Sequence, residues 1–144
     1  MINTCGFFII NSKKELLIAH PTNSRWSDYS IPKGLMEPDE TKFDAAIREL
    51  YEESNVDLSK ISLDQVIILP ETMYRSCKRI LCTFLYYADD TLDDVELKCH
   101  SYVDGKNYLE NDIVIWKPIH KCYGLLHEAQ TRLLPKVENL LDLK

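Results

Sequence analysis

The chain has 144 residues, of which 45% are hydrophobic and 28% are charged, and its formal net charge is −6. This size and composition exclude a disordered chain, and we expect residues 1–144 to form a single domain. No apolar run approaches the roughly 20 residues of a membrane-spanning helix, and Lys and Arg are too scattered for a nucleic-acid-binding face.

The first half of the chain predicts a hairpin, a further strand and a helix. Apolar runs at residues 5–10 and 15–20, separated by NSKK, predict two strands joined by a turn. Residues 26–34 predict a strand that ends in the turn sequence Pro-Lys-Gly. Residues 41–54 predict a helix, with Thr41 as N-cap and Asp44 completing a capping box.

The second half predicts more strands and a C-terminal helix. Residues 65–75, 78–88 and 112–119 are rich in β-branched and aromatic residues and predict strands. The Asp-rich segment 88–111 predicts mainly a loop, and residues 125–144 predict a helix that Pro135 kinks or divides. This order of elements predicts an α+β fold with helices packed on a mixed sheet.

The cysteines indicate a reducing compartment. There are five, an odd number without CxxC spacing, and the N-terminus has no secretory signal. We therefore expect reduced, mostly buried thiols and a cytoplasmic protein.

The negative charge is concentrated in one segment. Residues 34–56 hold seven acids and two bases, a balance of −5 against −6 for the whole chain. In the predicted helix, Glu49, Glu52 and Glu53 share one face, where like charges repel one another. The helix alone leaves two interpretations open, a solvated acidic face or a site for a divalent cation such as Mg²⁺, which prefers hard oxygen ligands.

The spacing of this segment favours the cation. Gly34 is followed after five residues by Glu40, and after seven more by Arg-Glu-Leu-x-Glu-Glu at residues 48–53, with Val56 completing the pattern. The pattern resembles the Nudix box, Gly-x5-Glu-x7-Arg-Glu-U-x-Glu-Glu-x-Gly-U, in which U is a bulky aliphatic residue. The resemblance implies a Nudix-type α/β/α sandwich, with a mixed β-sheet between helices. It also implies a Mg²⁺-dependent pyrophosphohydrolase that cleaves a nucleoside diphosphate linked to another moiety.

One position departs from the box. The family has glycine where this chain has Asn55, just after the predicted end of the helix. The backbone there is usually left-handed, a conformation that asparagine tolerates best after glycine. We therefore expect Asn55 to keep the geometry and the activity.

The resemblance also implies roles for the box residues. Glutamates of the Nudix helix bind Mg²⁺ or Mn²⁺, and we expect more than one ion per site. Arg48 is expected to orient these glutamates by ion pairing, and Glu40 to tie the loop to the helix or to bind metal through water. The expected metal ligands are Glu49, Glu52, Glu53 and the Gly34 carbonyl.

Outside the box the assignments rest on single residues. The family takes its general base from the box or from a later loop, and Glu110 and Glu96 are the candidates here. The four histidines form no spaced pair and are assigned no chemistry. Each candidate substrate-binding residue has an ordinary structural alternative; the candidates are Lys33 and Arg75 for phosphates, and Tyr29, Tyr74 and Trp26 for a nucleobase.

Two features outside the box favour a dinucleoside polyphosphate, such as diadenosine tetraphosphate, as substrate. YSIPKG resembles the Pro-Lys-Gly sequence of dinucleoside polyphosphate hydrolases, diphosphoinositol phosphohydrolases and decapping enzymes. Tyr74 lies eighteen residues after Val56, in the range where the first of these groups carries a tyrosine. Against this, Pro70 lies near a proline position of ADP-ribose pyrophosphatases.

Several alternatives therefore stay open. They are an ADP-ribose or FAD-type dinucleotide, an mRNA cap, a diphosphoinositol substrate, and a Nudix module that binds nucleotide without cleaving it. The expected partner is a nucleotide-derived small molecule, and nucleic acid enters only as an RNA 5′ end. Monomer and homodimer are both compatible with the sequence.

Overall fold

The computed structural model describes residues 1–76 and 78–142. The strands are β1 (Ile2–Asn11), β2 (Glu15–Pro21), β3 (Lys33–Leu35), β4 (Ile67–Ile68), β5 (Thr72–Met73), β6 (Arg79–Asp89) and β7 (Asn111–Pro118). The helices are α1 (Lys42–Ser54), α2 (Glu128–Thr131) and α3 (Leu134–Leu141), with 3-10 turns η1 (Leu63–Gln65) and η2 (Ile119–Lys121).

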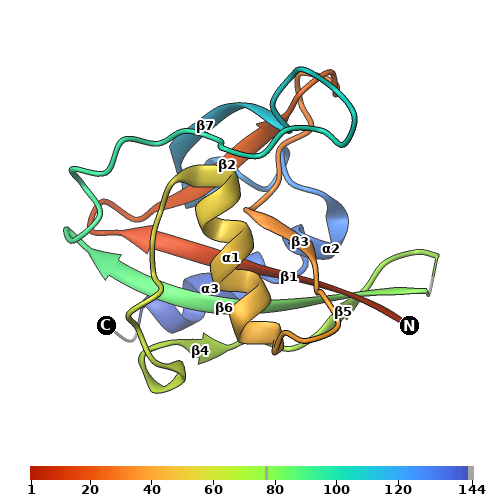
Figure 1. The fold of residues 1–144 in the computed structure, drawn as a ribbon. Coiled ribbons are helices and arrows are strands. Elements are labelled where there is room, and N and C mark those ends of the chain that lie inside the picture. The colour runs from red at the N-terminus through yellow and green to blue at the C-terminus, as the bar shows by residue number, and fades with distance from the viewer. Residues whose placement is uncertain (77, 143–144) are drawn as a thin grey trace.

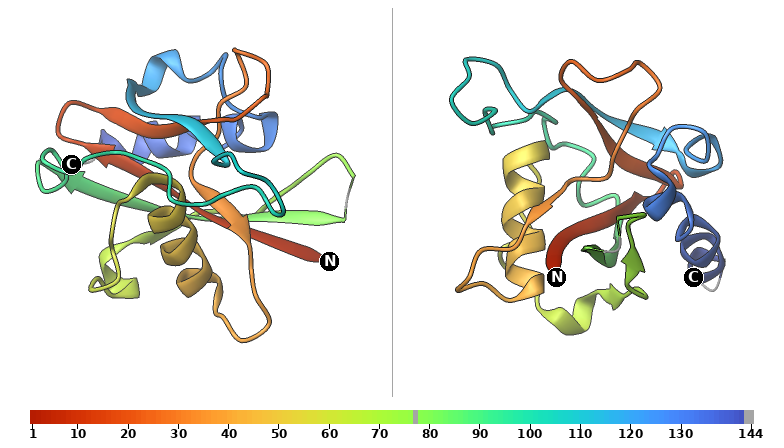
Figure 2. Two further views of the ribbon diagram at one scale, coloured as in Figure 1. Left: turned by 45° about the horizontal axis from the view of Figure 1, so that its top comes forward. Right: turned by 90° about the vertical axis from the view of Figure 1, so that its right-hand side faces the viewer.

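The strands form one mixed sheet in the order β4-β6-β1-β2-β7, to which β3 adds beside β1 and β5 beside β6. The β1–β6 pairing is parallel and the other pairings are antiparallel. Helix α1 covers one face of the sheet, and α2 and α3 lie on the other (Figures 1 and 2). The predicted α+β sandwich with a mixed sheet between helices is confirmed.

Strand β1 runs through the centre of both hydrophobic cores. Phe7 and Ile9 pack on the α1 side of the sheet, whereas Phe8 and Ile10 pack on the α3 side. All four side chains are fully buried. A strand covered on both faces needs a continuous apolar run, and this is the pattern seen in its sequence.

Several predicted elements differ from the structure in detail. The expected strand 65–75 is split into β4 and β5, because Pro70 lies between them and has no N–H to donate. In the expected strand 26–34 only its end is regular, as the start of β3. The C-terminal helix is divided, but the break precedes Pro135, which lies in the first turn of α3, where a missing N–H is harmless.

Helix α1 has the predicted boundaries. The Thr41 hydroxyl accepts a hydrogen bond from the Asp44 N–H at 3.0 Å, which is the Thr41 half of the predicted capping box. Asn55 has φ 71° and ψ 10°, so the predicted left-handed end is confirmed. Buried Ala46 and Leu50 hold the helix on the sheet. This anchoring fixes where its glutamates lie.

The described cysteines are free and buried, as expected; they are Cys5, Cys82, Cys99 and Cys122. Cys77 lies outside the described residues. Among the helices that the structure describes, none has the length and apolar character needed to cross a membrane.

Candidate active site

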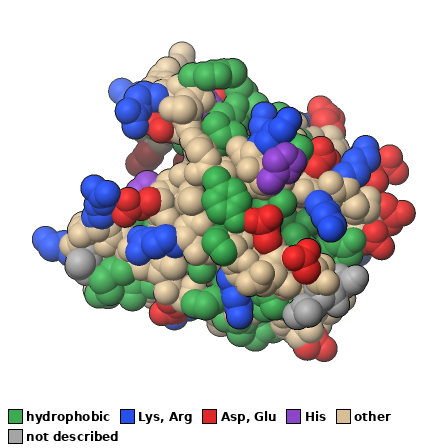
Figure 3. All heavy atoms as spheres, turned by 180° about the vertical axis from the view of Figure 1, so that it is seen from behind, with side chains coloured by type: hydrophobic (Ala, Val, Ile, Leu, Met, Phe, Trp, Pro, Cys, Tyr) green, Lys and Arg blue, Asp and Glu red, His purple; other side chains and the backbone are tan. Residues whose placement is uncertain are grey.

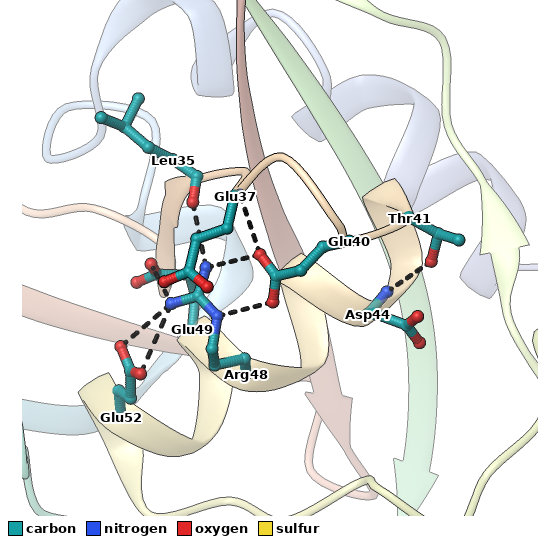
Figure 4. Close-up of polar contacts among 8 residues, drawn as sticks. All are labelled: Leu35, Glu37, Glu40, Thr41, Asp44, Arg48, Glu49 and Glu52. Atoms are coloured by element: carbon teal, nitrogen blue, oxygen red, sulfur yellow. Dashed lines mark hydrogen bonds and ion pairs between the residues drawn. The ribbon is translucent and has the colours of Figure 1, made fainter.

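Arg48 is the centre of a polar network that joins the loop before α1 to the helix (Figure 4). Its Nε and Nη2 donate to the two Glu40 oxygens at 2.7 and 2.8 Å, a bidentate pair. Nη2 also donates to the Leu35 carbonyl at 3.0 Å. Nη1 lies 2.9 Å from Glu49 Oε1 and 3.3 Å from Glu52 Oε2. Arg48 thus holds two of the three helix glutamates and the loop in one arrangement.

Glu53 has a different environment. Its carboxylate is buried and accepts a hydrogen bond from the Lys33 backbone N–H at 3.2 Å. Burial raises the pKa of Glu53 to about 8, although the Lys33 charge and N–H oppose the shift. Among the described residues Glu53 has no ion-pair partner. A buried carboxylate without a cation is unfavourable, so this position is suited to a metal ion.

The backbone of Gly34 lies directly against Glu49. A Cβ atom at Gly34 would lie 2.0 Å from the Glu49 carboxyl carbon and 2.2 Å from each of its oxygens. Any side chain at position 34 would therefore force the end of the Glu49 side chain to move from where it lies. Burial also raises the pKa of Glu49, against the opposing effect of the Arg48 hydrogen bond.

The donor chemistry fits a divalent cation, since three carboxylates and a backbone carbonyl supply hard oxygens. As the side chains stand, however, no three acidic, histidine or cysteine groups among residues 1–76 and 78–142 converge to hold an ion. Arg48 occupies oxygens of Glu49 and Glu52. An ion would have to compete with Arg48 for these two carboxylates.

The two candidate bases lie in different places. Glu110 directly precedes β7 and is half-buried, and its negative charge adds to the burial that raises the pKa of Glu49 and Glu53. Glu96 is exposed at the end of α1, where its carbonyl accepts a hydrogen bond from Asn55. Of the two, Glu110 is the one whose charge acts on Glu49 and Glu53.

A pocket of about 700 Å³ adjoins Glu53 through Lys33, which lines it. The surface seen from behind has a hollow at its left edge, with Lys and Arg side chains on both sides (Figure 3). Arg75 is outside this lining and pairs with Glu128 at 2.9 Å. Trp26 is 74% exposed, and its two neighbours in the sequence both line the pocket. The pocket lining includes aromatic and basic side chains, those of Tyr29, Lys33, Tyr74, Arg79 and His127.

The family model of the NUDIX domain matches residues 2–110, well over half of the chain. The chain belongs to the Nudix family. It is therefore a Nudix hydrolase, a pyrophosphohydrolase of a family that uses divalent metal ions.

Solved structures with the same fold include other Nudix proteins. A Caenorhabditis elegans Ap4A hydrolase in a binary complex has a TM-score of 0.75 and 20% identity, with 100% of both chains covered. A MutT protein from Methanosarcina mazei has a TM-score of 0.69 and 19% identity, covering 96% of this chain and 93% of that one. No curated protein sequence matches this Nudix hydrolase.

His127 is a pocket residue of the Nudix hydrolase that was not predicted from sequence, because the histidines were assigned no chemistry. The His127 ring lies 5.1 Å from the Tyr74 ring, centroid to centroid, and the Arg79 guanidinium carbon lies 5.9 Å from the Tyr74 centroid. Together they form an aromatic wall with a positive charge beside it. His127 precedes α2 and reaches the pocket only through the tertiary fold, so no local pattern identifies it.

His20 braces the segment that forms one side of the pocket. Its Nδ1 lies 2.7 Å from Asp112 Oδ1, and its Nε2 lies 2.8 Å from the Arg25 carbonyl. Both partners accept hydrogen bonds, so the protonated ring, with an N–H at each nitrogen, satisfies both contacts. Ser24 Oγ lies 3.3 Å from Nε2 and donates to the Pro21 carbonyl at 2.6 Å.

Asp112→Asn is expected to destabilise the protein at acidic but not at alkaline pH. Burial disfavours the charged ring, but the bonds to Asp112 and to the Arg25 carbonyl, with the nearby Asp28 charge, raise the net pKa of His20. When the pKa of a histidine is higher in the folded state, the protein gains its full stabilisation at pH values below the pKa of the unfolded state. This stabilisation is lost as pH rises through the pKa of the folded state. We expect Asp112→Asn to lower the free energy of unfolding by about 1 kcal/mol at pH 5.5 and by little at pH 9. The loss at pH 5.5 is modest because Asp112 is partly exposed. Urea unfolding at both pH values measures it, and equal losses would contradict the assignment.

Proposed function

We propose that this Nudix hydrolase cleaves a dinucleoside polyphosphate such as diadenosine tetraphosphate. The supporting observation is the pocket beside Glu53, whose volume of about 700 Å³ suits a nucleotide-sized ligand. Lys33 and Arg79 offer positive charge to phosphates. Tyr74 and His127 offer aromatic surface to a base.

We further propose that Mg²⁺, or Mn²⁺ in its place, binds to Glu49, Glu52, Glu53 and the Gly34 carbonyl, with more than one ion per site. The buried Glu53, which has no ion pair among the described side chains, supports this assignment. Bound there, the ions would neutralise phosphate charge and lower the pKa of the attacking water.

The protein groups then have separate tasks. Arg48 orients Glu49 and Glu52 through its hydrogen bonds. Glu110 accepts a proton from the water, whose oxygen forms a new bond to phosphorus. The phosphoanhydride P–O bond breaks, and the leaving nucleotide keeps the bridging oxygen. Lys33 and Arg79 hold the remaining phosphates.

Structural likeness adds a consistent but coarser argument. Two of the similar structures are of the C. elegans Ap4A hydrolase, at 20% and 22% identity. At this identity the likeness concerns the fold, so the proposal depends on the pocket and on the Tyr74 and Pro-Lys-Gly features.

The runner-up is an ADP-ribose or FAD-type dinucleotide. Pro70, between β4 and β5, is the feature that favours it. A capped RNA, a diphosphoinositol substrate and a non-catalytic module are retained as outcomes of the experiment below.

The test is chromatography of products after incubation with Mg²⁺ and a panel of substrates. The panel contains diadenosine tetraphosphate, diadenosine triphosphate, ADP-ribose, FAD, capped RNA, a diphosphoinositol phosphate and nucleoside triphosphates. Fastest release of ATP and AMP from the tetraphosphate is the expected result. Preference for ADP-ribose would support the runner-up, and no turnover of any compound would support a binding module.

The variant Arg79→Ala tests whether the pocket binds the substrate. We expect KM for the tetraphosphate to rise about tenfold, with kcat within about threefold, because a phosphate contact is lost and the acidic site is untouched. Arg132→Ala removes an arginine outside the pocket lining and is the matched control. Equal effects of the two variants would count against the pocket.

A further inference from the structure

The Asn55 side chain does something that the glycine of the Nudix box cannot do. Its backbone N–H donates to the Tyr51 carbonyl at 2.9 Å, a bond that glycine would keep. Its side-chain Nδ2, however, donates to the Glu96 carbonyl at 2.8 Å, and its Oδ1 lies 2.6 Å from His100 Nε2. Because Nδ2 is the donor to Glu96, Oδ1 accepts from a protonated Nε2.

The segment that follows Glu96 is attached to the end of α1 by further contacts. The Lys98 N–H donates to the Ser54 carbonyl at 3.2 Å, and the His100 N–H donates to the Glu52 carbonyl at 2.6 Å. The last carbonyls of a helix have no partner within the helix, so these amides satisfy them. The His100 ring also stacks on Tyr51, with centroids 5.0 Å apart and 20° between planes.

The attached segment is joined to the candidate base by a hydrogen bond. Ser101 follows His100, and its carbonyl accepts a hydrogen bond from the Glu110 N–H at 2.7 Å. Tyr102 and Leu109 form a bridge just above this bond, so residues 101–110 make a loop that closes at its base. Glu110 therefore lies at the stem of the loop. Its bonded partner Ser101 is the neighbour of His100, which contacts Asn55.

We propose that Asn55 and His100 are positioning residues that clamp the stem of loop 101–110 to α1 and so keep Glu110 beside Glu49 and Glu53. The catalytic part of this inference rests on the proposed function, in which Glu110 is the base. The Glu110 carbonyl also accepts from the Thr22 N–H at 2.8 Å, so loss of the clamp loosens the stem without detaching it.

The test variant is Asn55→Gly, which restores the family residue, keeps the left-handed backbone and removes both side-chain bonds. We expect hydrogen exchange at the His100 and Lys98 amides to quicken about tenfold or more. We expect kcat for the tetraphosphate to fall about tenfold, with KM within about twofold, since the pocket lies elsewhere and small displacements of a catalytic group are costly. The rise in melting temperature with Mg²⁺ should be unchanged.

Two further variants and a control sharpen the result. His100→Ala should repeat the effects, whereas His100→Gln should restore most of kcat, because the Gln amide can donate to Asn55 Oδ1. Lys14→Gly makes the same backbone change at another left-handed residue, φ 59°, in the turn between β1 and β2, and should leave kcat unchanged.

Each outcome has a distinct meaning. Unchanged exchange in Asn55→Gly would overturn the clamp, whatever the activity. Faster exchange with unchanged kcat, or an equal fall of kcat in His100→Gln and His100→Ala, would overturn the positioning role. A wild-type protein inactive on the whole panel would overturn the proposed function and the catalytic part together, and exchange would still decide the clamp.

Discussion

Replacing Glu53 by Gln is expected to abolish phosphoanhydride hydrolysis and also to stabilise the metal-free protein at pH 8. The substitution removes charge and almost no volume, so the fold stays intact while a proposed metal ligand is lost. We expect kcat to fall by at least about a hundredfold, the scale of losing one group that stabilises developing charge. Product chromatography with Mg²⁺ measures this part.

The stability effect follows from the environment of Glu53. Burial raises its folded pKa to about 8 from an ordinary 4.5. The folded state therefore binds the proton more tightly, and wild-type stability falls as pH rises from about 4.5 to 8. Gln does not titrate, so the variant should match wild type near pH 4.5 and exceed it at pH 8 by roughly 2–4 kcal/mol.

Urea unfolding in EDTA at pH 5 and pH 8 tests this difference. Mg²⁺ at pH 8 should stabilise wild type through binding to the folded state and should have less effect on the variant. Glu37→Gln, at an exposed acid of the same segment, is the control and should change neither activity nor stability. Full activity of Glu53→Gln, or the same stability difference at both pH values, would contradict the assignment.

Arg48→Met is expected to give the largest loss of stability among the site variants. Glu40 and Glu49 would lose hydrogen bonds of 2.7 to 2.9 Å and be left as partly buried charges. Breaking a buried ion pair destabilises by about 3–5 kcal/mol, and the 25% exposure of Arg48 lowers our expectation to about 2–3 kcal/mol. Activity should also fall, because Glu49 and Glu52 lose their orientation.

Two comparisons make this test specific. Arg48→Lys keeps the charge but not the planar fork, so it should recover only part of the stability. Arg25→Met removes an arginine whose side chain is 85% exposed and should change the free energy of unfolding by less than about 0.5 kcal/mol. Chemical denaturation of the three variants gives the values, and an Arg48→Met protein as stable as Arg25→Met would refute the role of the network.

Local sequence features predicted the parts of this protein that depend on near neighbours. The boundaries of α1 follow from the Thr41 cap and from Asn55 at its end. The shared face of the glutamates follows from helical spacing, and the strand β1 follows from the apolar run at residues 5–10. Each of these depends on residues a few positions apart, which is why a linear pattern contains them.

The breaks within two predicted elements, one strand and one helix, were less predictable. Pro70 was visible, but the sequence did not show that it divides one edge strand into β4 and β5. The predicted C-terminal helix is broken at residues 132–133, before Pro135, and helical periodicity does not show this break.

The properties of the site depend on contacts between distant segments. The raised pKa of Glu53 comes mainly from its burial in the folded protein, and His127 joins Tyr74 in the pocket across more than fifty residues. The sequence therefore identified a Nudix hydrolase through its box. Folding brings the pocket, the buried carboxylate and the Asn55–His100 contact together, because burial and long-range hydrogen bonds exist only when separate segments pack.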